Sequence, residues 1–147
     1  MMKLQRILVP VSGNEADREA VELACSIAKE IKGKVYVVYV IQVKRSLPLD
    51  AELNPETETA EDILARAEEV ADEQDYEIET DLLQTREIGP AIIDEAMERS
   101  VDLILMGMGY RKRFGQFDLG ETIPYVLKNA PCRVLVLRQP LLSEQTE

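Results

Sequence analysis

The sequence predicts an α/β protein with a five-stranded, mostly parallel sheet and helices on both faces. Short apolar runs alternate along the chain with longer segments whose apolar residues recur at helical spacing, a pattern typical of parallel sheets. All runs but the third are nearly continuously apolar, as in strands covered on both faces. We expect strands at residues 6–11, 35–41, 76–83, 101–107 and 132–138, and helices at about 14–32, 57–75, 89–99 and 124–130.

The first two strands flank a well-marked helix. The run "RILVPV" is followed by apolar residues three or four positions apart, and Gly33 ends this helix. The longest apolar run, "VYVVYVI", then gives the second strand. The helical spacing is carried by Ala20, Val21, Ala24, Ile27, Ala28 and Ile31.

The third strand differs from the others because it alternates. Its acidic residues point to one face and Tyr76, Ile78, Thr80 and Leu82 to the other, so one face meets water and the strand belongs at an edge. A strand order of 3-2-1-4-5 satisfies this pattern and places a switch in strand order between strands one and four. Ligands of such sheets bind in the crevice at that switch.

The last strand occupies the opposite edge in this order. Residues Val134, Leu135, Val136 and Leu137 are apolar on both of its faces, and a bare apolar edge invites pairing with another chain. We therefore expect a homodimer formed through this strand.

Length, charge and hydropathy exclude several classes of protein. The 147 residues suit one domain, which we place at residues 1–140 with a flexible tail at 141–147. The net charge of −11 argues against binding to nucleic acid or to an anionic membrane. The longest apolar run is far shorter than the roughly 20 residues that span a bilayer, and the N terminus has no signal-peptide pattern. We expect a cytoplasmic protein.

The composition also limits catalysis. The chain has no histidine, which excludes Ser-His-Asp and Cys-His catalysis and makes a zinc site improbable. Cys25 and Cys132 are expected to be free, buried thiols in a reducing compartment.

Three stretches together resemble one known family. They are "ILVPVSGNEADREAVELA", "VDLILMGMG" and "LGETIPYVLKNAPCRVLVLR". The chain from Ile7 to Arg138 is similar to the universal stress protein family along nearly its whole length. The resemblance implies a Rossmann-like, adenine nucleotide alpha hydrolase-like form of the fold argued above, and dimerisation through the last strand.

ATP-binding members of this family share a pattern after the fourth strand: Gly, two residues, Gly, nine residues, Gly, then Ser or Thr. Gly107 and Gly120 match the first and third glycines, but Tyr110 replaces the second and Glu121 replaces the hydroxyl residue. The tyrosine ring would hinder close approach of the backbone to phosphates. The carboxylate would repel a phosphate by about 4 kcal/mol at roughly 4 Å and an effective dielectric of about 20.

The nucleoside side of the crevice differs as well. The family's ATP-binding members have an Asp after the first strand, where this chain has Ser12. The resemblance implies apolar or backbone contacts to adenine from Pro10, Val40 and Met106, which buried core residues would explain equally well. Thr122 either caps the last helix, which we favour, or replaces the missing hydroxyl from one position further on.

Basic residues at two loops favour an anion. Lys44 and Arg45 follow the second strand, and Arg111, Lys112 and Arg113 follow the fourth. The predicted topology brings both groups to the mouth of the crevice, where they form a candidate anion site. Solvated cations that pair loosely with Asp118 and Glu121 are the simpler reading.

These observations predict a non-enzymatic, homodimeric module with a degenerate nucleotide site and no cofactor. It would act through contacts with a protein partner that the sequence does not identify. The alternative is an ATP-binding member of the family, with Mg²⁺, in which the basic loop compensates for Tyr110 and Glu121.

Overall fold

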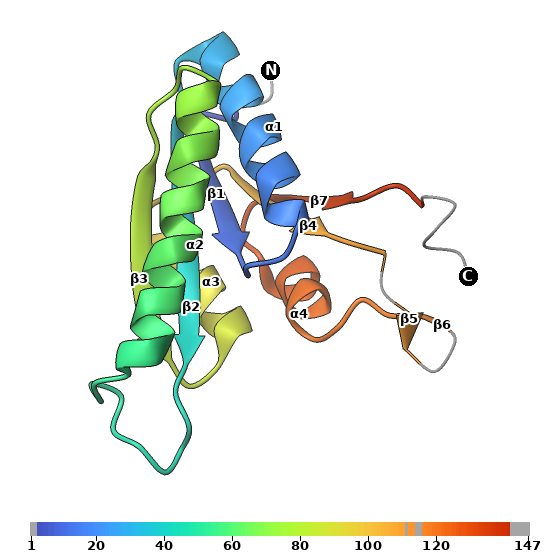
Figure 1. Ribbon diagram of the computed structural model, residues 1–147. Coiled ribbons are helices and arrows are strands. Elements are labelled where there is room, and N and C mark those ends of the chain that lie inside the picture. The colour runs from blue at the N-terminus through green and yellow to red at the C-terminus, as the bar shows by residue number, and fades with distance from the viewer. Residues whose placement is uncertain (1–2, 111, 114–115, 142–147) are drawn as a thin grey trace.

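A parallel five-stranded sheet forms the centre of the molecule (Figure 1). The computed structural model describes residues 3–110, 112–113 and 116–141. The strand order is β3-β2-β1-β4-β7, which confirms the order 3-2-1-4-5 predicted from the sequence. The strands are β1 (Arg6–Val11), β2 (Lys34–Gln42), β3 (Glu79–Thr85), β4 (Leu103–Met108) and β7 (Arg133–Arg138).

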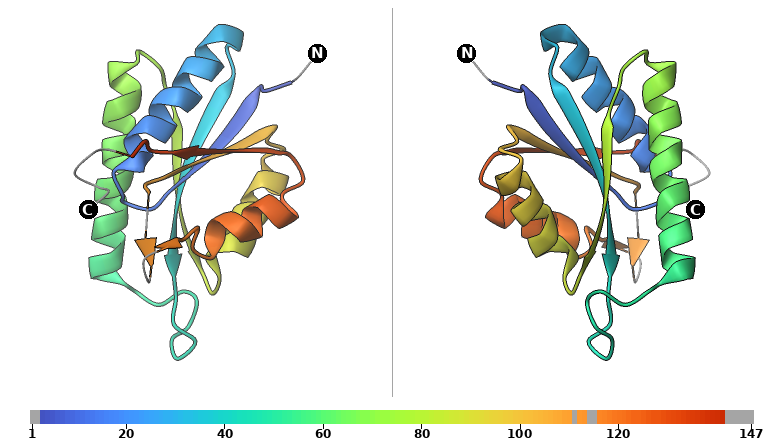
Figure 2. Two further views of the ribbon diagram at one scale, coloured as in Figure 1. Left: turned by 90° about the vertical axis from the view of Figure 1, so that its right-hand side faces the viewer. Right: turned by 90° about the vertical axis from the view of Figure 1, so that its left-hand side faces the viewer.

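Helices cover both faces of this sheet (Figure 2). On one face lie α1 and α2, and on the other α3 and α4. Each face buries its own apolar core, and β1 contributes to both because Ile7, Leu8 and Val9 are fully buried. The helices are α1 (Ala16–Ile31), α2 (Asn54–Glu73), α3 (Ile88–Glu98) and α4 (Thr122–Asn129).

The third strand starts three residues later than the sequence predicts. After α2 the chain turns through Asp75, whose φ is 54°. The Tyr76 hydroxyl donates to the Gly33 carbonyl, so Tyr76 ties this connection to the turn before β2 and does not enter the sheet. The edge position of β3 is confirmed, because among the described residues it pairs only with β2.

The connections after β2 and after β4 also differ from the prediction. Helix α2 begins at Asn54, with Pro55 in its first turn, where a missing N–H has no consequence. The long connection after β4 contains a two-stranded hairpin of β5 (Lys112–Arg113) and β6 (Gln116–Phe117). The hairpin was not expected because two-residue strands leave no periodicity in a sequence.

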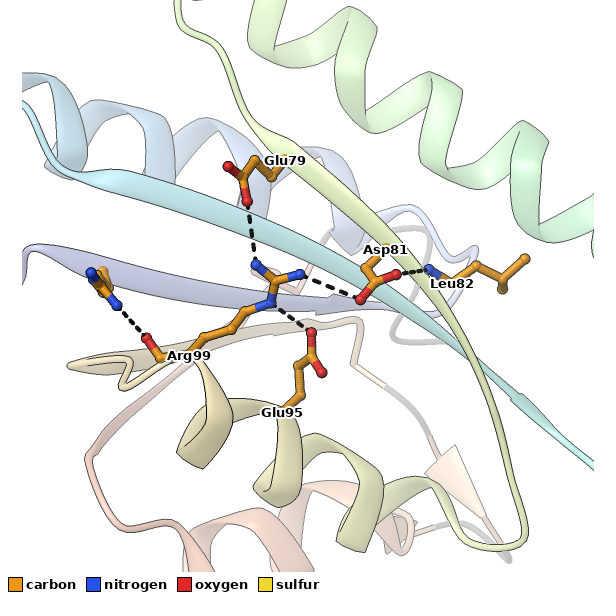
Figure 3. Close-up of polar contacts among 6 residues, drawn as sticks. Glu79, Asp81, Leu82, Glu95 and Arg99 are labelled. Atoms are coloured by element: carbon orange, nitrogen blue, oxygen red, sulfur yellow. Dashed lines mark hydrogen bonds and ion pairs between the residues drawn. The ribbon is translucent and has the colours of Figure 1, made fainter.

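An arginine joins α3 to the sheet at the end opposite the crevice (Figure 3). The Arg99 guanidinium contacts Glu95 at 2.6 Å, Glu79 at 3.3 Å and Asp81 at 3.4 Å. It also lies 4.5 Å from the centre of the Tyr36 ring. The hydrogen bond that Arg99 donates to the Glu95 carboxylate is the main cause that raises the pKa of Arg99. Glu95 is 6% exposed, and this contact compensates its buried charge.

The edge strand β7 is half-buried and apolar on both faces, as the sequence predicts. Val134 and Val136 pack against the core under α3 and α4, whereas Leu135 packs against the core under α1. Its outer backbone edge pairs with no strand in the part of the chain that the structure describes. No helix among the described residues is long and apolar enough to cross a membrane.

Candidate nucleotide-type crevice

A cavity of about 280 Å³ opens at the C-terminal ends of β1 and β4. The chain leaves β1 for α1 on one face of the sheet and leaves β4 toward α4 on the other, so the two connections diverge and leave a crevice. Apolar side chains form most of its wall, and polar groups come from the loop after β1 and from the start of α4. The lining includes Val11, Asn14, Tyr39, Ile88, Ile92, Met108, Gly109, Leu119 and Ile123.

Eight of the nine residues predicted for a nucleotide site line this one cavity. They are Pro10, Ser12, Val40, Met106, Gly107, Gly120, Glu121 and Thr122. Residues far apart in the sequence therefore meet where the sequence predicts. The family motif could not reveal Tyr39, Ile88 or Ile92, because apolar residues of a strand or helix look alike whether they face core or cavity.

Tyr110 is the exception. It does not line the cavity, and its ring lies 5.2 Å from the guanidinium carbon of Arg138, at the end of β7. Its φ is not positive, so the backbone here does not require glycine. In this arrangement, the tyrosine ring is turned toward the edge strand and does not fill the crevice.

Gly107 is explained by packing. A Cβ atom at this position would lie 2.5 Å from the Ala16 carbonyl oxygen, so any side chain would push α1 away from β4. The close approach of α1 therefore requires glycine, with or without a ligand. Gly120, in contrast, needs glycine for its φ of 73° and has open space around it.

The loop after β1 is held by one carboxylate. Asp17 accepts hydrogen bonds from the backbone N–H groups of Ser12, at 3.1 Å, and Gly13, at 2.7 Å. Burial raises the pKa of Asp17, against the opposing effects of these two bonds and of Arg66. Asn14 ties the loop further by donating to the Ser12 hydroxyl at 2.7 Å. The N–H groups of Ser12 and Gly13 are therefore already engaged by Asp17 and are not free for an anion.

The start of α4 presents a carboxylate to the cavity. Glu121 occupies the N-cap position, is exposed, and makes no side-chain capping hydrogen bond. Thr122 is the first helical residue and lines the cavity, so our expectation that it caps the helix is wrong. The prediction placed Pro124 at the second helical position. The helix starts one residue earlier, at Thr122, and Pro124 then occupies the third position, which is still in the first turn and tolerates a proline equally well.

The structure does not show the basic residues after β2 and those after β4 coming together in one cluster. Lys44 and Arg45 are exposed and do not line the cavity. Figure 1 shows the loop after β2 well apart from the β5–β6 hairpin. Arg111 lies outside the described residues, and of Lys112 and Arg113 only the backbone is described. The anion site formed by these cations remains a prediction.

Comparison with known proteins assigns the chain to a family. The model of the universal stress protein family matches residues 3–138. This chain belongs to the universal stress protein family. A universal stress protein of Methanocaldococcus jannaschii is 31% identical over 142 residues, which span 92% of this chain and 83% of that protein.

Solved universal stress proteins share the fold. One from Archaeoglobus fulgidus has a TM-score of 0.77 and 22% identity, over 90% of this chain and 97% of its own. Another from the same organism, in complex with dAMP, has a TM-score of 0.70 and 20% identity, over 92% of this chain and 98% of its own. At these identities the likeness establishes the Rossmann-like, adenine nucleotide alpha hydrolase-like fold of this universal stress protein.

Proposed function

We propose that this universal stress protein is a cytoplasmic, non-enzymatic dimer whose nucleotide-type crevice holds phosphate groups weakly, and that it acts through protein contacts. The complex of a related protein with dAMP supports a nucleoside-shaped crevice. The apolar wall formed by Pro10, Val40 and Met106 suits an adenine ring. The absence of histidine from the sequence supports a role without catalysis.

Glu121 is the observation that carries the proposal. Helix N termini bind phosphates because their free N–H groups and the helix dipole favour negative charge. At the start of α4 that favourable position already holds a carboxylate of the chain itself. A phosphate would have to approach this charge, whereas an uncharged nucleoside would not.

A specific observation favours the alternative, an ATP-binding protein. Tyr110 lies outside the cavity lining, and Gly107 and Gly120 are both kept. The tyrosine ring that the sequence predicted to obstruct phosphate binding therefore does not lie in the cavity. Two obstacles to a phosphate remain: the Glu121 carboxylate, and the N–H groups of the loop after β1 that Asp17 already engages.

Calorimetric titration with adenosine and with ATP and Mg²⁺ tests the proposal. We expect the wild type to bind adenosine at least as tightly as ATP. The change Glu121→Ser should increase ATP affinity about ten- to a hundredfold, because it removes a charge repulsion that solvent partly screens. Adenosine affinity should stay the same.

The matched control is Glu87→Ser, which removes a carboxylate from the N terminus of α3, outside the cavity lining. It should change neither affinity. Wild-type protein that binds ATP in the micromolar range and tighter than adenosine would instead establish the alternative.

A further inference from the structure

A second cavity, which we call the base-side cavity, adjoins the crevice at the end of β2. It has a volume of about 400 Å³. Three of its lining residues also line the crevice: Tyr39, Val40 and Ile88. Its other walls come from the end of β2 and the first turns of α2, and they are Ile41, Gln42, Pro55, Glu56 and Thr59. Among the described residues, none from β1, β4 or α4 lines it, so it extends the crevice on the side away from α4.

The two cavities meet around the C-terminal end of β2. Successive residues of a strand point to opposite faces of a sheet. Val40 accordingly packs in the core under α3 and α4, and Tyr39 packs against the core under α1 and α2. Both side chains nevertheless line both cavities. The space therefore continues around the end of the strand, from the crevice to the start of α2.

The crevice alone is small for a ligand site. Sites for small molecules usually measure roughly 300–1,000 Å³, and the crevice measures about 280 Å³. The base-side cavity, at about 400 Å³, is larger than the crevice that it adjoins. A ligand that reached into both cavities would bury more of its surface than a nucleoside confined to the crevice.

The proposed nucleoside would direct its base toward the base-side cavity. In the proposed function a phosphate would approach Glu121 at the start of α4, and the adenine ring would lie against Pro10, Val40 and Met106. The 6-amino group of adenine lies on the part of the base that is remote from the ribose. Of the three residues against the ring, only Val40 also lines the base-side cavity. A substituent on the 6-amino nitrogen would therefore pass Val40 and enter that cavity.

Two polar side chains of the base-side cavity are engaged by the protein's own backbone. The Gln42 amide donates a hydrogen bond to the Arg86 carbonyl at 3.0 Å. The Thr59 hydroxyl donates to the Pro55 carbonyl at 3.1 Å. A polar substituent would have to compete with these bonds, whereas an apolar one would not.

The charge and the remaining walls of the base-side cavity also favour an apolar group. Ile41 is buried, and Tyr39 and Ile88 are half-buried, so the last two keep surface that a ligand could cover. Glu56 is the one charged residue among the described residues that line this cavity, and its carboxylate would repel an anion. An apolar, uncharged group suits these walls, whereas a phosphate does not.

We propose that the site takes an adenine nucleoside with an apolar group on its 6-amino nitrogen, and that this group sits in the base-side cavity. The inference rests on the proposed nucleoside-shaped crevice and names the class of nucleoside that fills it. The nucleoside holds the ligand in the crevice, and the substituent covers Tyr39 and Ile88. Burial of about half of an aromatic substituent should tighten binding about tenfold.

Calorimetric titration with adenosine and with N6-benzyladenosine tests the inference. We expect the wild type to bind the benzyl compound about tenfold more tightly than adenosine. The compound 5′-O-benzyladenosine carries the same apolar group at the opposite end of the nucleoside, toward α4, and should show no such gain. Equal gains from the two benzyl compounds would overturn the inference, because they would show apolar contact without a particular site.

The variant Thr59→Lys places a long, charged side chain at the base-side cavity from an exposed position on α2 that does not line the crevice. It should abolish the gain from the 6-benzyl group and leave adenosine affinity unchanged, which also shows that the variant is folded. The matched control is Thr57→Lys, the same change two residues earlier in α2 and outside the lining of both cavities. It should keep the gain.

The outcomes separate this inference from the proposed function. Adenosine binding with no gain from the 6-benzyl group would overturn the base-side site and leave the crevice as proposed. A gain that survives Thr59→Lys would do the same. A wild type that binds neither adenosine nor N6-benzyladenosine would overturn the nucleoside-shaped crevice together with this inference.

Discussion

Asp17 shows how a single residue shapes the crevice. The family's ATP-binding members carry an Asp directly after the first strand, and this chain has Ser12 there. A carboxylate is nevertheless present in the loop, five residues later, and it binds the N–H groups of Ser12 and Gly13. The Asp17 carboxylate holds the loop by accepting these hydrogen bonds, so it faces the protein backbone and not a nucleoside.

The raised pKa of Asp17 predicts a pH-dependent contribution to stability. Burial lifts this pKa above its ordinary value of 3.8, so the native state binds the proton more tightly than the unfolded chain does. The contribution of that proton is complete below pH 3.8 and is lost as the pH rises through the native pKa. The difference in unfolding free energy between the wild type and Asp17→Asn should therefore fall as the pH rises from 3.8.

Urea titrations of both proteins between about pH 4 and pH 7 would measure this difference, because the other carboxylates are common to both. A difference that grows with pH would mean that the two hydrogen bonds and Arg66 outweigh burial.

At the scale of elements, the attachment of helix α3 to the sheet depends on the side chain of Arg99 at its C-terminal end. Arg99 follows the last residue of the helix and reaches Glu79 and Asp81 on β3, an edge strand with little apolar surface of its own. Its backbone carbonyl accepts a hydrogen bond from the Arg6 guanidinium at 2.9 Å, which adds β1 to the same junction. One residue thus fastens α3 to strands on both sides of β2.

The change Arg99→Met should lower the unfolding free energy by about 2–3 kcal/mol, since it leaves the Glu95 carboxylate buried without its cation. The double variant with Glu95→Gln should recover part of this loss, because it removes the uncompensated charge. Urea denaturation of the two variants and the wild type would measure both effects. Equal stabilities of the single and the double variant would show that the buried charge is not the cause.

For the whole molecule, the free edge of β7 predicts the assembly state. Leu135 and Leu137 are only half-buried in one copy, and edge pairing would bury the apolar surface that remains. We expect the wild type to sediment as a dimer at micromolar concentration. Lysines at both positions should give a monomer, because two charges cannot be buried in the junction without partners.

The control for this change is Leu127→Lys, in α4, where the side chain is 51% exposed and lies outside β7. It should leave the dimer intact. A wild-type mass equal to that of one chain would contradict the prediction.

The sequence by itself determined the order of the strands and the place of the crevice. Alternation in residues 76–83 marked an edge strand, although its start at Glu79 was missed, and continuous apolar runs marked the buried strands. The spacing of Gly107, Gly120 and Glu121 predicted that these residues lie at one crevice, and they line one cavity. Such features are readable because burial on one or both faces leaves a period in the chain.

Only the tertiary structure decided which side chains meet. It turned the Tyr110 ring to Arg138, directed Asp17 to the loop after β1, and left an oxygen of Glu19 buried without a donor. It also joined Arg99 to carboxylates that lie 18 and 20 residues earlier in the chain. Local periodicity records how deeply a residue is buried, whereas the partner of a polar group depends on how separate elements pack against each other.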